Sequence, residues 1–384
     1  MDTVLYGHLA AVYGETAAPE ILSRLEARLA SYQGPSRPAR PFDQRDAFLI
    51  TYGDMVRQPG EAPLHTLGEF LRAHVRGFVR GVHLLPFYPY TSDDGFSVVD
   101  YTAVDPALGS WADVERLGQD FRLAFDAVIN HISAHSAWFQ GYLRDEAPYR
   151  DYFITVDPAA DLSAVFRPRA LPLLTQVDTA AGPRHVWTTF SADQIDLNFA
   201  NSEVLLAIVD VLLFYAARGA EVIRLDAIAF LWKEIGSRCL HQPEAHHIVQ
   251  LLRRVFDRVA PQVALLTETN VPHRENVSYF GDGHDEAQMV YNFSLPPLVL
   301  HAIQTGSAAP LSAWAGELST PSDETAFFNF LASHDGIGVT PARDIIGDAA
   351  IDWLAERVEA LGGFVSYKNN PDGSQSAYEL NINY

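Results

Sequence analysis

Short apolar segments recur along the chain and alternate with longer amphipathic stretches. Each apolar segment has the length and bounding residues of a buried β-strand. The stretches 64–75, 202–219 and 244–260 carry apolar residues at three- and four-residue spacing, which predicts helices. Strands that alternate with helices in this way predict an α/β fold with a parallel sheet, either open or closed into a barrel. The apolar segments are 47–52, 81–87, 122–131, 221–227, 263–269, 287–293 and 327–335.

One interval breaks the alternation. The stretch between His131 and Glu221 is too long for a single helical crossover, and much of it is irregular and rich in Pro, Arg and aromatic residues. Upstream of the first strand, residues 18–32 have a helical pattern and residues 33–42 resemble a linker. We therefore expect four parts. They are an N-terminal helical extension and linker (1–45), barrel strands one to three (46–131), an inserted domain (132–200), and strands four to seven with the following segment (201–384).

Charged side chains stand where the predicted strands end. Because the carboxyl ends of parallel strands meet at one face of a barrel, these side chains are expected to converge. If only one pair of oppositely charged side chains stood there, it could be a structural ion pair. Three carboxylates, an arginine and two histidines on one face would cost several kcal/mol of desolvation per ion, which favours an active site. The residues are His131, Arg224, Asp226, Glu268, His334 and Asp335.

Enzymes that cleave glycosidic bonds generally need two carboxyl groups, one on each side of the bond. The nucleophile must be ionised and its partner protonated, so their environments must separate their pKa values. Arg224 and Asp226 stand two residues apart on one strand and therefore point the same way, so the guanidinium can keep this carboxylate charged. Glu268 would then be the general acid, and Asp335 could stabilise positive charge. A retaining enzyme would place the carboxyl groups of Asp226 and Glu268 ~5–5.5 Å apart.

Four motifs, taken in order, resemble those of the α-amylase superfamily, glycoside hydrolase family 13. They are DAVINH (126–131), RLDAIAF (224–230), LLTET (265–269) and ASHDGIG (332–338). The resemblance covers about residues 45 to 384 and implies a (β/α)8 TIM barrel with an inserted domain B after strand three. It gives Asp226 the role of nucleophile, Glu268 that of general acid/base and Asp335 that of transition-state stabiliser. Arg224, His131 and His334 fall on sugar-binding positions.

The stretches 81–114 and 224–244 look like the sucrose phosphorylase subfamily. Within it, TSDDGFSVVDY (91–101) is closer to members that act on sucrose 6'-phosphate, glucosylglycerate or glucosylglycerol. The resemblance places Asp93 on a position that binds the outer hydroxyls of glucose, although Asp94 could take that role. It implies a retaining α-glucoside phosphorylase that gives α-glucose 1-phosphate. Inorganic phosphate would be the co-substrate, no cofactor would be needed, and the partners would be small molecules.

A phosphate dianion beside three carboxylates requires cations. Arg167, Arg169 and Lys233 are candidates, and for each the alternative is a solvated surface charge. Phe96 and Phe230 could pack against a sugar ring, although core packing is the commoner role of a single aromatic residue.

The composition limits the classes of partner and the cellular location that the chain is expected to have. The formal net charge is −21, which argues against a nucleic-acid or anionic-membrane partner. The only cysteine, Cys239, excludes a disulfide within the chain and fits a cytoplasmic location. No secretory signal or membrane span is visible. His241, His246 and His247 do not have the spacing that favours a metal site.

The subfamily continues beyond the seventh strand through the last barrel strand and a β domain. Residues 377–384 alternate and could form a strand, but nothing convincing as an eighth barrel strand follows Phe328, so we expect a truncated chain. The alternatives are therefore an amylase-like α-glucosidase or transglucosidase, or an inactive fragment. A non-catalytic scaffold is disfavoured because all three carboxylates are present.

Overall fold

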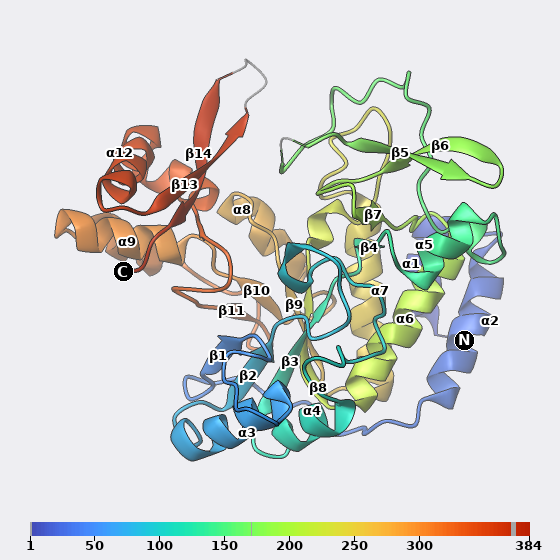
Figure 1. Cartoon of the computed structure of the whole chain (residues 1–384), viewed down its shortest axis with the longest axis horizontal. Coiled ribbons are helices and arrows are strands. Elements are labelled where there is room, and N and C mark those ends of the chain that lie inside the picture. Colours follow the sequence, from blue (N-terminus) through green and yellow to red (C-terminus); the bar gives the residue numbers. More distant parts are fainter. Residues whose placement is uncertain (1, 170, 370–373) are drawn as a thin grey trace. The chain divides into compact units, whose positions relative to one another are not determined.

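A computed structural model describes residues 2–169, 171–369 and 374–384 of the chain. The chain forms two compact units, and Figure 1 gives the course of both along the sequence. The first unit comprises Met1–Arg167 and Leu171–Leu265, and the second comprises Pro168–Ala170 and Leu266–Tyr384. No helix among the described residues is long and apolar enough to cross a membrane.

Parallel strands form the centre of the first unit. Gly81 pairs with both Phe48 and Arg122, and Asp126 pairs with Arg224, so neighbouring strands advance in register. Every residue of β3 is buried, as is typical of a parallel strand that is covered on both faces. The strands, in their order in the sheet, are β1 (Phe48–Thr51), β2 (Gly81–Leu84), β3 (Arg122–Ala127) and β8 (Ala220–Leu225).

Helices follow these strands and form the outer layer of the first unit. They are α3 (Pro63–His74), α4 (Trp111–Leu117), α6 (Ser202–Ala217) and α7 (Pro243–Val259). At the N-terminus, α1 (Thr3–Tyr13) packs on α7 and α2 (Ala18–Ser31) packs on α6. The sequence did not predict α1. Its start is fixed by Asp2, whose carboxylate accepts hydrogen bonds from two backbone N–H groups of the first turn and pairs with Arg254 of α7.

Between β3 and β8 the chain leaves the parallel sheet. Here β4 (His131–Ser133) pairs antiparallel with β7 (Gln194–Asp196), and β5 (Leu174–Thr179) forms a hairpin with β6 (Gly182–Trp187). Two short helices, α5 (Ala137–Leu143) and η2 (Tyr149–Asp151), precede the hairpin. Trp187 and Cys239 are buried in a small apolar cluster of this region, which gives the cysteine a packing role. The bounds 132–200 for a separate domain stay a prediction.

The second unit begins with three parallel strands and ends with a small antiparallel sheet. The parallel strands are β9 (Ala264–Thr267), β10 (Met289–Tyr291) and β11 (Ala326–Phe328). The antiparallel sheet has the order β12 (Ile337–Gly338), β14 (Gln375–Asn381), β13 (Phe364–Asn369). The helices are α8 (His273–Asn276), η4 (Val277–Phe280), α9 (Leu295–Thr305), α10 (Ala309–Glu317), η5 (Thr340–Ala342), α11 (Arg343–Ile346) and α12 (Asp348–Ala360).

Two predicted strands differ from the observed ones, and the possible strand at 377–384 belongs to another sheet. The segment 122–131 is not one strand, because the N–H of Ile129 donates to the carbonyl of Ala127 and turns the chain between β3 and β4. The segment 327–335 is a strand only to Phe328, and Leu331 beyond it is 44% exposed, so no buried face continues there. Residues 377–381 belong to β14, which pairs antiparallel with β12 and β13 and therefore is not a barrel strand.

Candidate active site

Asp226 directly follows β8, and Arg224 on that strand is paired with it. The Arg224 Nη1 donates to Asp226 Oδ1 at 2.8 Å and to Asp126 Oδ1 at 2.6 Å. The guanidinium is 3% exposed, so both bonds are shielded from water. The i, i+2 spacing thus brings the two side chains together as expected.

Asp126 is a site residue that the sequence reasoning missed. It lies on β3 directly opposite Arg224, is fully buried, and also contacts His83 Nε2 at 2.8 Å. The signal was present, because a buried strand rarely carries a carboxylate without a partner. Asp126 thus holds the guanidinium in place from the neighbouring strand, while His83 holds Asp126.

The pKa of Asp226 is raised above its usual value because the carboxyl group is buried. Arg224 and His131 oppose this effect, whereas Asp126 adds to it. Arg224 therefore limits the rise in pKa without abolishing it. The group gains reactivity as a nucleophile from being poorly solvated, but only in its ionised form.

The chain turns sharply after Asp226. Ala227 has a left-handed backbone (φ 50°), and Phe230 N–H donates to its carbonyl, forming η3 (Ile228–Phe230). A non-glycine residue in this conformation is strained and is often found at functional sites. The Phe230 ring contacts Phe166 and Phe190, so it belongs to an aromatic cluster, and a role against a sugar ring stays a prediction.

His131 begins β4 and is buried. Its Nε2–H donates to the Phe96 carbonyl at 2.8 Å, and its Nδ1 lies 3.2 Å from the Asn130 amide nitrogen. The Phe96 ring lies beneath the Arg224 guanidinium, 5.6 Å from the centroid. Phe96 therefore joins the loop after β2 to both predicted sugar-binding residues, and this packing role is distinct from the predicted contact with sugar.

Lys233 is buried. This differs from both interpretations of the sequence, in which Lys233 was either a cation available to bind phosphate or a solvated surface charge. Its ammonium lies 2.6 Å from Asp196 Oδ2 and donates to Asn130 Oδ1 at 2.7 Å. Burial lowers its pKa and the carboxylate of Asp196 raises it in part. Removing one partner of such a buried pair is strongly unfavourable, so Lys233 is better placed to connect β7 with the residue before His131 than to bind phosphate.

Asp93 lies in η1 (Asp93–Gly95), within the loop after β2. Both Asp93 (φ 56°) and Asp94 (φ 48°) have left-handed backbones. The Gln194 side-chain amide donates to Asp93 Oδ2 at 2.9 Å, which connects this loop to β7. Arg167, farther along the chain, is exposed and donates to the Leu171 carbonyl.

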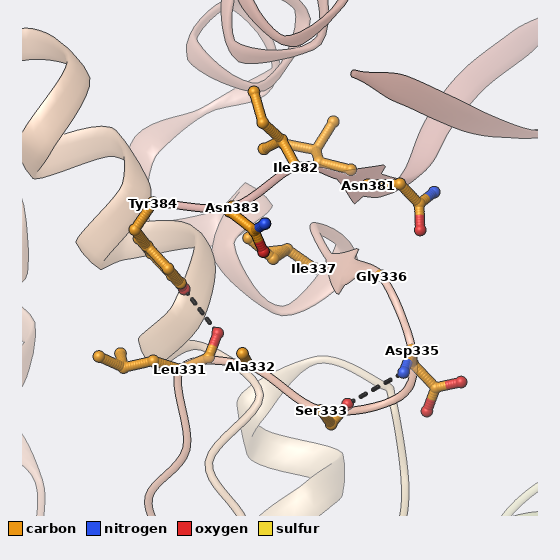
Figure 2. A pocket seen from close by; sticks show the side chains of 11 residues that line it. Leu331, Ala332, Ser333, Asp335, Gly336, Ile337, Asn381, Ile382, Asn383 and Tyr384 are labelled. Carbon is orange, nitrogen blue, oxygen red and sulfur yellow. Dashed lines mark hydrogen bonds between the residues drawn. The ribbon is translucent and has the colours of Figure 1, made fainter. Parts of the chain in front are cut away.

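The second unit holds the other two predicted catalytic carboxylates. Glu268 directly follows β9 and is half-buried. Asp335 lies in the loop after β11 with a side chain that is 51% exposed, and Oδ2 is 3.3 Å from His334 Nε2. Figure 2 shows Asp335 beside a cavity of about 290 Å³ whose wall also includes Ser333, Gly336 and Asn381.

β14 contributes two residues that the sequence reasoning did not single out. Burial and the charge of Asp335 raise the pKa of Glu379 to about 7, and Arg169 opposes the rise. Burial together with the charges of Glu379, Glu268 and Asp335 raises the pKa of Tyr378. Asp335 and Arg169 therefore act on both side chains, and Glu268 acts on Tyr378. The alternation of residues 377–384 indicated a strand here, but no motif marked Tyr378 or Glu379 as functional.

Asp226 belongs to the first unit, whereas Glu268 and Asp335 belong to the second, so the carboxyl separation of ~5–5.5 Å stays a prediction. Among the described residues, no group of three or more His, Cys, Asp or Glu side chains could hold a metal ion. His241, one of the histidines considered for such a site, has its pKa lowered to about 4 by burial.

Comparison with known proteins decides the family. Residues 77–337 match the alpha amylase catalytic domain, which is more than half of the chain. The chain belongs to the α-amylase family. Its relatives place it in the sucrose phosphorylase-like branch of glycoside hydrolase family 13, as predicted. It is 57% identical to a glucosylglycerate phosphorylase of Allomeiothermus silvanus, over 97% of this chain and 67% of that protein. It is 50% identical to the one from Escherichia coli, over 100% and 69%.

Other members of the branch are more distant. A sucrose phosphorylase of Bifidobacterium adolescentis is 33% identical over 81% of this chain and 63% of that protein. The crystal structure of sucrose 6F-phosphate phosphorylase from Thermoanaerobacter thermosaccharolyticum is 25% identical, with a TM-score of 0.77 over 88% of this chain and 70% of that one. These matches confirm the predicted α/β barrel fold and the predicted class, the α-glucoside phosphorylases. The chain spans about two thirds of the length of the curated relatives it matches.

Proposed function

We propose that the full-length protein is a glucosylglycerate phosphorylase, which transfers glucose from glucosylglycerate to inorganic phosphate. The observation that carries this proposal is the gap in identity. Relatives named for glucosylglycerate are 50–57% identical, whereas the sucrose phosphorylase of Bifidobacterium adolescentis is 33% identical. The products would be glycerate and α-glucose 1-phosphate.

In the first step, Asp226 attacks the anomeric carbon of glucose and the bond to the glycerate oxygen breaks. Glu268 donates a proton to that oxygen, so glycerate leaves as a neutral alcohol at its hydroxyl. The product on the enzyme is a β-glucosyl ester of Asp226. Arg224 supports this step because its guanidinium, held by Asp126, favours the ionised carboxylate that must attack.

In the second step, an oxygen of inorganic phosphate attacks the same carbon and displaces the Asp226 carboxylate. Glu268, now ionised, takes any proton that the attacking phosphate oxygen loses. Two inversions leave the glucose in its original α configuration. Asp335 stabilises the positive charge that develops on the sugar ring in both transition states.

Glycerate and phosphate are both anions, so both steps require cations on the acceptor side. Arg169 is the best supported candidate, because its charge acts on Glu379, whose pKa Asp335 also raises. Arg167 is a second candidate, since its side chain is exposed and donates to the Leu171 backbone carbonyl. Lys233 is less suited because its ammonium is already paired with Asp196.

The test is to incubate the full-length protein with glucosylglycerate in the presence and absence of phosphate. We expect α-glucose 1-phosphate and glycerate in equal amounts with phosphate, and little free glucose without it. The Asp226→Asn variant, prepared in the same way, should give neither product. Free glucose as the main product at the same rate with and without phosphate would reject the proposal in favour of a hydrolase.

A further inference from the structure

The loop that carries Asp93 is a closed hairpin with a strained tip. At its base, the N–H of Thr91 donates to the carbonyl of Ser97 at 3.1 Å. At its tip, three successive residues, Asp93, Asp94 and Gly95, have positive φ angles of 56°, 48° and 107°. A left-handed backbone costs a non-glycine residue roughly 1–2 kcal/mol. Contacts with the surrounding structure must therefore hold this loop in place.

One carboxylate holds both ends of the loop. Asp193 Oδ2 accepts hydrogen bonds from the hydroxyls of Thr91 (2.6 Å), Ser92 and Ser97 (2.8 Å), and Oδ1 accepts one from Ser133 (3.2 Å). Burial tends to raise the pKa of Asp193, but the four hydroxyl donors outweigh it and the pKa lies below its usual value. Asp193 is therefore ionised at neutral pH, and hydrogen bonds to a charged acceptor are stronger than neutral ones.

The next residue holds the tip of the loop. Gln194 is 1% exposed, and its amide nitrogen donates to Asp93 Oδ2 at 2.9 Å and to the Phe96 carbonyl at 3.2 Å. Its amide oxygen accepts from the Ser191 hydroxyl at 2.8 Å, which fixes the orientation of the amide. Gln194 begins β7, the partner strand of β4, which carries His131. The same ribbon thus supports two residues predicted to bind glucose.

We propose that Asp193 is a positioning residue of the glucose subsite, which acts through the loop Thr91–Ser97 to fix the carboxylate of Asp93. The proposal rests on the proposed function and deepens it. Asp193 itself touches no substrate. Its loss frees the ends of the loop, so Asp93 samples other positions and contributes less to binding glucose. Because the loop acts on the glucose subsite in this proposal, binding of phosphate should depend on it much less.

The experiment is a double-mutant cycle in the full-length protein with Asp193→Ala, Asp93→Ala and both changes together. For Asp193→Ala we expect KM for α-glucose 1-phosphate to rise roughly tenfold, the factor that about 1.4 kcal/mol gives. KM for phosphate in the forward reaction should change by less than about twofold. The double variant should be no worse than Asp93→Ala alone, because residues that act through one another are not additive.

The matched control is Asp157→Ala, an exposed carboxylate in the same inserted segment that accepts from the Ala159 N–H. It should leave both KM values unchanged. If Asp193→Ala does not fold, Asp193→Asn replaces it in the double-mutant cycle, since asparagine keeps the shape of the side chain and lacks its charge. Additive effects of Asp93 and Asp193, or equal rises in KM for both substrates, would overturn the proposal. If the wild type hydrolyses glucosides instead, the proposed function fails, while the coupling is still measurable on the hydrolysed glucoside.

Discussion

At the residue scale, the site depends on one arginine between two buried carboxylates. Arg224 donates to both Asp126 and Asp226, and burial raises the pKa of Asp226 against its influence. The Asp226→Asn variant keeps the size of the side chain and removes the nucleophile. We expect its turnover to fall by at least about 10⁴-fold, as in other sites that lose a group acting in the transition state. Circular dichroism should show an intact fold, and turnover above about one per cent of wild type would refute the assignment.

The raised pKa of Asp226 has a consequence for pH dependence. The nucleophile must be ionised, so kcat/KM should fall as pH drops through a pKa above the usual value of an aspartate. Replacing Arg224 by Gln removes the main influence that lowers this pKa, so the acidic limb should move to higher pH. Arg224→Lys keeps the charge and should move it less. The measurement is the pH profile of kcat/KM for the wild type, Arg224→Gln and Arg224→Lys. If the acidic limb lies at the same pH in all three, Arg224 does not lower the pKa of Asp226.

The pairing of Arg224 with Asp226 could be predicted from the sequence because the two residues stand two positions apart at the end of one strand, Arg224 within β8 and Asp226 directly after it. The partners from other segments could not. Asp126 comes from the neighbouring strand and Asp196 from β7, and their pairing with Arg224 and Lys233 depends on how the chain returns to the sheet. For this reason Lys233 looked like a free cation in the sequence, whereas it is one half of a buried ion pair.

At the element scale, two elements are candidates for determining acceptor specificity. They are the irregular segment before β5 and the strand β14. An anionic acceptor gains charge-assisted hydrogen bonds from arginine, so Arg169→Ala should raise KM for glycerate roughly tenfold and leave KM for glycerol nearly unchanged. Arg167→Ala is the matched comparison and should have the smaller effect, because Arg169 is the one whose charge acts on Glu379. An equal rise in KM for glycerate and glycerol would show that neither arginine recognises the charge of the acceptor.

β14 also makes the stability of the second unit depend on pH. Glu379 has a pKa of about 7 in the folded protein, against roughly 4.3 in an unfolded chain. Between these values the folded state holds a proton that the unfolded state releases, so stability falls as pH rises through this window. Asp335 and Arg169 are the charged groups that act on Glu379.

Glu379→Gln should remove this dependence, which amounts to at most roughly 1.4 kcal/mol per pH unit from one group. The measurement is urea unfolding of wild type and variant at pH 5.5 and pH 7.5. Wild type should lose more stability than the variant on going to the higher pH. Parallel behaviour of the two proteins would mean that Glu379 titrates normally.

At the scale of the whole molecule, the periodicity of the sequence was enough to predict the parallel strands and the helices α2, α3, α6 and α7, but not α1, α9, α10 or α12. Strand ends were less predictable, because where a strand stops depends on burial that an apolar run alone does not reveal. The run 327–335 illustrates this, since Leu331 is apolar yet exposed. In the small sheet, the pairing of β12 with β14 joins segments about 40 residues apart, which no local pattern encodes, whereas β13 and β14 are neighbours in the sequence.

The proposed function depends above all on glycerate being the acceptor. The most direct measurement gives the full-length protein α-glucose 1-phosphate together with glycerate, fructose, fructose 6-phosphate or glycerol, and follows phosphate release with each. We predict that glycerate gives the highest kcat/KM of the four, at least roughly tenfold above the neutral acceptors fructose and glycerol, since a charged group matched to its site is worth about 1.4 kcal/mol or more. A higher kcat/KM with fructose or fructose 6-phosphate would contradict it, as would cleavage of maltose-type chains without glucosylation of any of the four acceptors.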